Sequence, residues 1–258
     1  MKIRPLRRLN QADLSNDVMH FTDRWGKDNI VVPPEILKLD ARQRLEAILA
    51  ERRIHAFQTF FTCGTPVVCF TEATREGMQA LINGMLRRYV PWGIGFSKDF
   101  ILHHGGGPAF YVRGDRWDDF AASDLPGSVK AFGTMFWPGV ELEEGEGAAR
   151  TLTKQNEWAH EREWRVPFEA EGAALTFAYS DVSTVVAPSI DAWGRVVTEL
   201  GLQRDLGHVT VIDIPGPEKP PRAEVASAEP DAEDAYDDPR IRRMLGLAPR
   251  NVEDMMEE

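Results

Sequence analysis

Two short segments of this 258-residue chain carry side chains that could act on a sugar. The first is His20-Phe21-Thr22, which follows the apolar residues Val18 and Met19 and is typical of a short strand. Alternation along a strand places His20 and Thr22 on one face and turns Phe21 toward the core. An imidazole and a hydroxyl on one face can hydrogen-bond the hydroxyls of a ribose. The alternative is a surface strand with a polar outer face.

The second segment reads EREWRVP from Glu161 and combines two carboxylates with a guanidinium. In strand geometry Glu161, Glu163 and Arg165 share one face, while Trp164 and Val166 point into the core. A carboxylate on a rigid strand can bond a ribose hydroxyl and stabilise the positive charge that develops as a glycosidic bond loosens. The alternative is a solvated ladder of Glu and Arg side chains on a sheet face.

Other chemistries have less support in the sequence. The six histidines include no pair at the i, i+4 spacing of a metal-binding helix, and Cys63 and Cys69 do not form a CxxC motif. The segment Gly93-Ile94-Gly95 lacks the third glycine of a dinucleotide-binding fingerprint. We therefore expect no metal site. Two reduced thiols are typical of a cytoplasmic protein.

The elements that must position these side chains are predicted from apolar spacing and capping residues. Helices are expected within residues 40–53, 71–86 and 189–201. Asp40 and Gln43 are placed to form a capping box on the first of them. Ser189 is expected to cap the last helix and Gly201 to end it, with Ile190, Trp193, Val197 and Leu200 as its core stripe. Strands are expected at residues 18–22, 66–70, 93–96, 109–112, 164–168, 174–177, 182–187 and 209–214. A glycine-rich loop at residues 105–108 is expected to join two of the strands as a long hairpin. Because strands and helices do not alternate regularly, we predict an α+β fold and not a doubly wound parallel sheet.

Composition and charge divide the chain into a body and a tail. The chain is 43% hydrophobic with a net charge of −11, and 12 acidic against 6 basic residues lie from Glu218 onward. The body's remaining charge of −5 does not attract nucleic acid non-specifically, although a local basic site is compatible with it. We predict one domain over residues 1–214, an acidic Pro-rich linker over 215–238 and a short helix over 239–258. No apolar run is long enough to span a membrane.

Four segments together resemble the AbiGi family, which is linked to bacterial abortive infection, a form of phage defence. They are Pro66–Glu72 (PVVCFTE), Tyr89–Lys98 (YVPWGIGFSK), Gly107–Val112 (GPAFYV) and Glu161–Pro167 (EREWRVP). The resemblance covers roughly residues 17–190 in the same order, and GIGFSK and EREWR are its most specific parts.

This resemblance places the chain near proteins that look like ADP-ribosyltransferases, including DarT-like enzymes that modify DNA. It implies an ADP-ribosyltransferase-like α+β fold with a split mixed or antiparallel sheet and about three main helices. It also implies NAD as the substrate, with ADP-ribose transferred to a nucleic acid or a protein.

The residues that would carry this activity follow from the same resemblance. His20 and Thr22, with Phe21 between them, would hold the NAD ribose. Glu163 would be the catalytic carboxylate, and Glu161 takes its place if the strand phase is shifted.

Two arginines complete the implied cofactor site. Arg53 matches the arginine of DarT-like enzymes by position alone, and Arg165 would pair with a carboxylate or a phosphate. If the site forms, the side chains of His20 and Glu163 should converge on one cleft.

A second hypothesis follows from the same family, which is also described as the antitoxin partner of a two-gene system. The chain would then be a non-catalytic antitoxin or regulatory module that binds a cognate toxin chain. A nuclease or another hydrolase is a third alternative.

Overall fold

A computed structural model describes residues 15–22, 24–25, 34–58, 62–83, 88–136 and 162–216. All of them belong to one compact unit, formed by residues 1–138 and 156–217. Glu161, the predicted linker beyond Gly216 and the predicted helix over 239–258 lie outside the described residues. No helix in the described part of the chain has the length and apolar character needed to cross a membrane.

The described residues form seven α-helices, two 3-10 turns and thirteen strands. The helices and turns are α1 (Pro34–Leu37), α2 (Ala41–Glu51), α3 (Arg75–Asn83), α4 (Lys98–His103), η2 (Gly114–Arg116), α5 (Trp117–Ala122), α6 (Gly127–Lys130), η4 (Tyr179–Asp181) and α7 (Ile190–Glu199). The strands are β1 (Asp17–Phe21), β2 (Arg24–Trp25), β3 (Arg53–His55), β4 (Val67–Thr71), β5 (Arg88–Tyr89), β6 (Gly93–Ser97), β7 (Gly107–Pro108), β8 (Phe110–Arg113), β9 (Gly133–Phe136), β10 (Glu163–Pro167), β11 (Ala174–Thr176), β12 (Val182–Ala187) and β13 (Thr210–Asp213).

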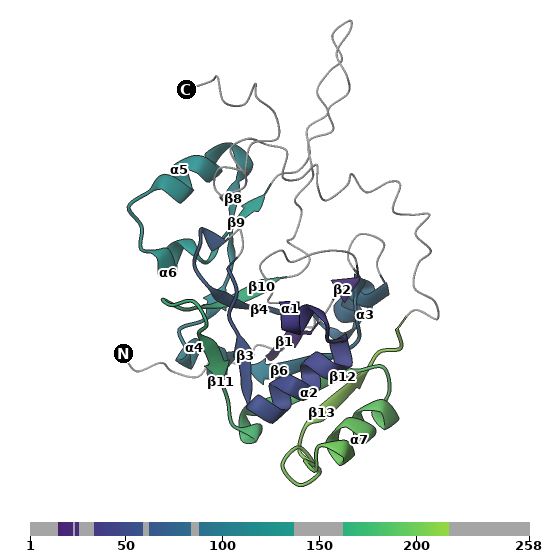
Figure 1. Cartoon of the computed structure of the whole chain (residues 1–258). Helices are drawn as coiled ribbons and strands as arrows, with labels where there is room; N and C mark the ends of the chain where they lie inside the picture. Colours follow the sequence, from purple (N-terminus) through teal and green to yellow (C-terminus); the bar gives the residue numbers. More distant parts are fainter. Residues whose placement is uncertain are drawn as a thin grey trace, which may run out of the picture. The chain divides into compact units, whose positions relative to one another are not determined.

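Seven strands form the central sheet, in the order β13-β12-β6-β1-β4-β10-β7 (Figure 1). Neighbouring strands are antiparallel except β12 and β13, which are parallel and are joined through α7, as a parallel connection requires. Three further sheets of two strands each pair β3 with β11, β2 with β5 and β8 with β9. The predicted α+β class is confirmed, and the sheet is mixed but mostly antiparallel.

The sheet is weakly joined between β1 and β4. A single residue pair connects these two strands, whereas β1 pairs with β6, and β4 with β10, over five residue pairs each. Beyond that pair, the Cys69 carbonyl of β4 accepts a hydrogen bond from the His20 imidazole. Further along β4, Val67 exchanges backbone hydrogen bonds with Phe57. Along this edge of β4, the backbone of β1, the His20 side chain of β1 and the backbone of Phe57 thus meet alternate residues.

The two faces of the sheet carry separate hydrophobic clusters. Face A, the face that carries Val18 and Phe70, packs with buried residues of α2 and α7 in the larger cluster. Face B, which carries Met19, packs with buried residues of α3 in the smaller cluster. Gly95 of β6 makes room for the Met19 side chain, because a Cβ there would lie 2.3 Å from the Met19 sulfur.

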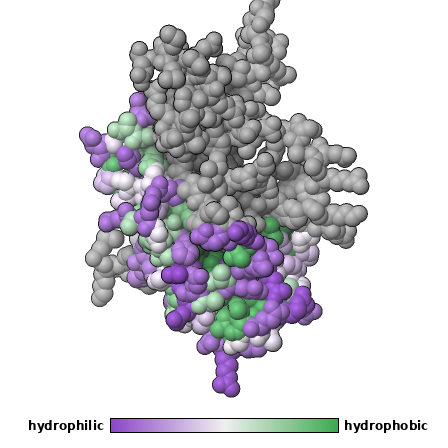
Figure 2. Space-filling model, viewed as in Figure 1, coloured by the Kyte–Doolittle hydropathy of each residue, from purple (hydrophilic) through white to green (hydrophobic). Residues whose placement is uncertain are grey.

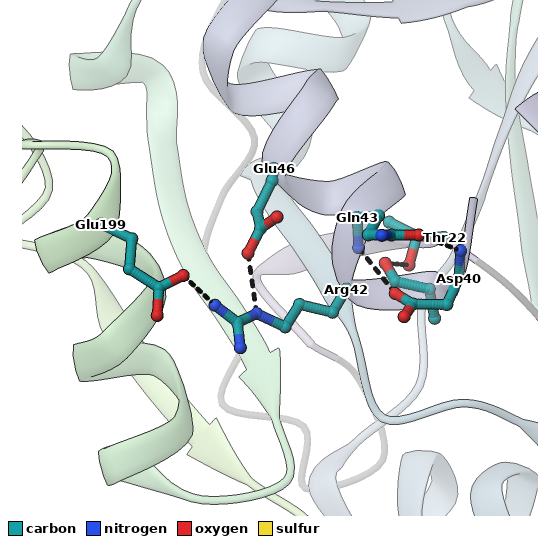
Figure 3. Close-up of polar contacts among 7 residues, drawn as sticks. Thr22, Asp40, Arg42, Gln43, Glu46 and Glu199 are labelled. Atoms are coloured by element: carbon teal, nitrogen blue, oxygen red, sulfur yellow. Dashed lines mark hydrogen bonds and ion pairs between the residues drawn. The ribbon is translucent and has the colours of Figure 1, made fainter.

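Local sequence signals account for several element ends. The Asp40 carboxylate accepts a hydrogen bond from the Gln43 backbone N–H, and the Gln43 side-chain oxygen accepts one from the Asp40 backbone N–H. The predicted capping box at the start of α2 is therefore confirmed (Figure 3). As predicted, Ser189 caps α7 and Gly201 follows its end, with a left-handed φ of 69°.

Two expectations about packing are wrong. The strands at residues 93–96 and 109–112 do not form a hairpin, because α4 follows β6 directly and β8 pairs with β9 in another sheet. Ile190, expected in the core stripe of α7, is exposed, because the buried face of the helix is formed by Ala192, Trp193 and Val196.

Candidate functional site

The strand registers place His20 and Glu163 on opposite faces of the sheet. Met19 on β1 lies opposite Thr71 on β4, and Thr71 lies opposite Glu163 on β10. Directly paired residues share a face, so these three side chains all belong to face B. His20 follows Met19 and lies on face A, with its ring centroid 5.8 Å from that of Phe70. The expected convergence of His20 and Glu163 on one cleft is therefore wrong.

The His20 imidazole closes the gap between β1 and β4. Its Nδ1 lies 2.9 Å from the Cys69 carbonyl oxygen, which can only accept, so Nδ1 carries the proton. Burial lowers the pKa of His20, although the bond to Cys69 partly opposes this. The ring is therefore neutral at neutral pH, and its donor joins the two halves of the sheet.

Thr22 and Phe21 also have internal roles. The buried Thr22 hydroxyl lies 2.7 Å from the carbonyl oxygen of Ala41 and 3.1 Å from that of Trp92. Figure 3 shows Thr22 beside the first turn of α2, next to Asp40. The Phe21 ring packs against Tyr89 at 4.8 Å. The hydroxyl that was expected to meet a ribose fixes the start of α2 against the end of β1.

Arg53 lies in the separate sheet of β3 and β11. Its Nε donates to the Glu51 carboxylate at 2.7 Å, and this bond lowers the pKa of Glu51. Arg53 is exposed on the surface and is not on the central sheet with His20 and Glu163.

Glu163 and Arg165 form a paired unit on face B, as the predicted strand phase requires. Arg165 Nε and Nη2 donate to the two carboxylate oxygens of Glu163, each at 2.9 Å. The side chains are 3% exposed for Arg165 and 16% exposed for Glu163. Burial is the largest single influence on Arg165 and lowers its pKa, but the Glu163 carboxylate, with smaller contributions from Cys69 and Tyr111, raises the pKa of Arg165 overall.

The same guanidinium reaches into a neighbouring part of the fold. Arg165 Nη1 donates to the carbonyl oxygens of Ala131, at 2.6 Å, and Gly133, at 2.7 Å. Both carbonyls belong to residues 109–136, which contain β8, α5, α6 and β9 and which we call the aromatic lobe. For Glu163 and Arg165, the solvated ladder considered as the alternative is therefore not what forms, because Arg165 is buried, Glu163 is mostly buried and the guanidinium binds the lobe.

The aromatic lobe carries most of the exposed apolar side chains in the described ranges. Phe110, Tyr111, Leu125 and Val129 are between 38% and 44% exposed, and Ile190 of α7 is the one further large apolar residue in the described ranges with high exposure. In Figure 2 pale green surface lies among purple over this lobe, at the upper left of the view.

A buried carboxylate that the sequence did not single out lies on face A. Glu72, at the end of β4, accepts from Trp164 Nε1 at 2.7 Å and forms an ion pair with Lys98. The Lys98 ammonium also lies 5.5 Å from the centroid of the Trp164 ring. Glu72 directly follows β4 and Lys98 directly follows β6. A charged residue directly after an apolar strand was the sequence signal that could have pointed to this ion pair.

Metal and thiol chemistry find no support in the described ranges. No group of three or more His, Cys, Asp or Glu side chains there is arranged to hold a metal ion. Cys63 and Cys69 are free thiols, and burial raises the pKa of Cys63, which disfavours its nucleophilic thiolate.

No family model matches the chain, and neither a curated protein nor a solved structure gives a significant match. The likeness to the AbiGi family rests on the four sequence segments alone.

Proposed function

We propose that this chain is a non-catalytic binding module of a phage-defence system and that it associates with a partner protein of that system. One observation carries the proposal: His20 and Glu163, which an ADP-ribosyltransferase would need around one ribose, lie on opposite faces of the sheet. Catalysis requires the reacting groups to be held together, and this register separates them.

The internal bonds of the same residues support the proposal. The Nδ1 atom of His20, the Thr22 hydroxyl and the Arg165 guanidinium are bonded to backbone carbonyls or to a carboxylate. Releasing any of them would leave a buried polar group without its partner, which costs about 1–3 kcal/mol per group. Transfer of ADP-ribose from NAD to a nucleic acid or protein stays a prediction that requires a different arrangement of these strands.

The aromatic lobe is the surface that this function would use. Exposed apolar side chains that gather in one region of a protein are typical of interaction sites, and aromatic residues dominate binding energies at protein interfaces. Phe110 and Tyr111 have this character, and each ring is held edge-on by another aromatic ring, Phe120 at 5.7 Å and Phe136 at 6.2 Å. Side chains fixed in this way lose little conformational entropy on binding.

The test is association of the purified chain with the product of the neighbouring gene of the two-gene system, measured by light scattering and titration calorimetry. We expect a stable complex that Phe110→Ser combined with Tyr111→Ser weakens at least about tenfold, the scale for loss of an aromatic anchor. Ile190→Ser is the matched control, because Ile190 is exposed but lies outside the lobe. Equal affinity of the lobe variant and the control would exclude the lobe as the binding surface.

A further inference from the structure

A buried side chain of the central sheet makes two hydrogen bonds to the aromatic lobe. Among the described contacts, the Ala109 N–H donates to the Glu163 carbonyl and the Thr65 hydroxyl donates to the Gly127 carbonyl at 3.2 Å. A further contact is the Arg165 guanidinium, which binds two lobe carbonyls at once. The bonds from Arg165 are buried, whereas the bond from Thr65 is exposed.

The bonds of Arg165 lead directly to the exposed aromatic rings. Gly133, whose carbonyl it holds, is the first residue of β9 and pairs with Phe110 on β8. The next pair along the two strands joins Tyr111 to Thr134. The position of the guanidinium thus sets the position of β9, and β9 sets the strand that carries both exposed rings.

Glu163 fixes the guanidinium in this position. Its two carboxylate oxygens accept from Nε and Nη2 of the guanidinium. The remaining nitrogen, Nη1, therefore points toward the lobe carbonyls. A planar guanidinium can serve a carboxylate and two carbonyls together, whereas a lysine ammonium cannot reproduce this fork. The negative charge of Glu163 also compensates the buried positive charge.

We propose that the Glu163–Arg165 pair is a lock that holds the aromatic lobe in its partner-binding orientation, so that these two residues position the binding surface without touching the partner. This inference rests on the proposed function for its biological meaning, but the lock itself is a property of the chain alone. The segment that resembles a catalytic motif would then serve to orient a binding surface.

The lock is tested by hydrogen exchange measured by mass spectrometry on the full-length chain. Arg165→Lys should raise the exchange rate of amides in residues 110–113 and 131–136 at least about tenfold, while β6 and β12 keep wild-type rates, because local opening is separable from global unfolding. Glu163→Gln retains an acceptor for Arg165 and should give a smaller increase in the same peptides.

The chain offers a matched control for these variants. Arg113, like Arg165, makes two hydrogen bonds from Nε and Nη2 to a carboxylate two residues away, that of Asp115. Both bonds are 3.0 Å long, but the Arg113 side chain is 79% exposed. Arg113→Lys should leave all exchange rates unchanged. Wild-type exchange in the lobe of Arg165→Lys would overturn the lock, and so would an equal increase in every strand of both Arg165→Lys and Glu163→Gln.

Partner binding separates failure of the lock from failure of the proposed function. If the lock operates, Arg165→Lys should weaken the partner complex although Phe110 and Tyr111 are intact. A complex that depends on the two rings but not on Arg165 would contradict the lock and leave the proposed function standing. Faster lobe exchange in a chain that binds no partner would support the lock and contradict the proposed function.

Discussion

Replacing Lys98 with methionine should destabilise the fold strongly, because it leaves the Glu72 carboxylate buried without its cation. The two side chains are 14% and 9% exposed, so solvent offers little compensation. Removing one partner of a buried ion pair costs about 3–5 kcal/mol, and the Trp164 N–H that stays on Glu72 favours the lower end of that range. For a chain of this size, about 3 kcal/mol corresponds to a fall in Tm of roughly 6–12 °C.

A double-mutant cycle identifies the cause of that loss. Combining Lys98→Met with Glu72→Gln removes the unpaired charge and keeps an acceptor for the Trp164 N–H. The double variant should therefore be more stable than Lys98→Met alone, with a coupling energy of about 1–3 kcal/mol. Urea unfolding followed by circular dichroism measures all four proteins under the same conditions.

The exposed pair of Arg113 and Asp115 supplies the comparison for this cycle. Arg113→Met should cost less than about 1 kcal/mol, because exposed ion pairs contribute little. If Lys98→Met costs no more than Arg113→Met, the reasoning from burial is wrong and the Glu72 carboxylate is compensated in another way.

Three further substitutions test individual contacts by urea unfolding. Burial lowers the pKa of His20 in the folded chain below its usual 6.5, so as the pH falls the unfolded chain is protonated before the folded chain. The contribution of His20 to the free energy of unfolding is therefore present above pH 6.5 and is lost as the pH falls. The stability advantage of wild type over His20→Asn should shrink between pH 7.5 and pH 5, and a constant difference would exclude this titration. Thr22→Val should cost about 1–2 kcal/mol, because the single hydroxyl hydrogen that lies between the buried carbonyls of Ala41 and Trp92 is lost, and a neutral effect would show that the backbone N–H on the Trp92 carbonyl suffices. Gly95→Ala should cost about 1–3 kcal/mol, because the new Cβ overlaps the Met19 sulfur, and an unchanged midpoint would show that Met19 moves freely.

Local features of the fold were predictable because they depend on residues close in the sequence. The capping box of Asp40 and Gln43 and the left-handed Gly201 each involve neighbours within one or two turns. The alternation of Glu163, Trp164 and Arg165 across β10 likewise needs only the geometry of one strand.

The candidate site was not predictable in the same way, because it depends on register between distant strands. Whether His20 shares a face with Glu163 is decided by two pairings of β4, Met19 with Thr71 and Thr71 with Glu163. A shift of one residue in either pairing would have placed both side chains on one face. No pattern within β1 or β10 contains that information.

The residues that the sequence did not single out have a similar origin. Glu72 and Lys98 are 26 positions apart, and only the antiparallel pairing of β1 with both β4 and β6 brings their elements together. Each residue alone is an ordinary charge at the end of an apolar strand. Their burial against Trp164 is a tertiary property.

Release of nicotinamide from NAD by the full-length chain tests the central claim most directly. The chain should be incubated with NAD alone and with single-stranded DNA, RNA or a protein extract as acceptor, and nicotinamide should be measured by chromatography. The non-catalytic account predicts no release above the buffer level under any of these conditions. Release of many equivalents per chain, lowered at least about 100-fold in a folded Glu163→Gln variant, would contradict it and establish Glu163 as a catalytic carboxylate.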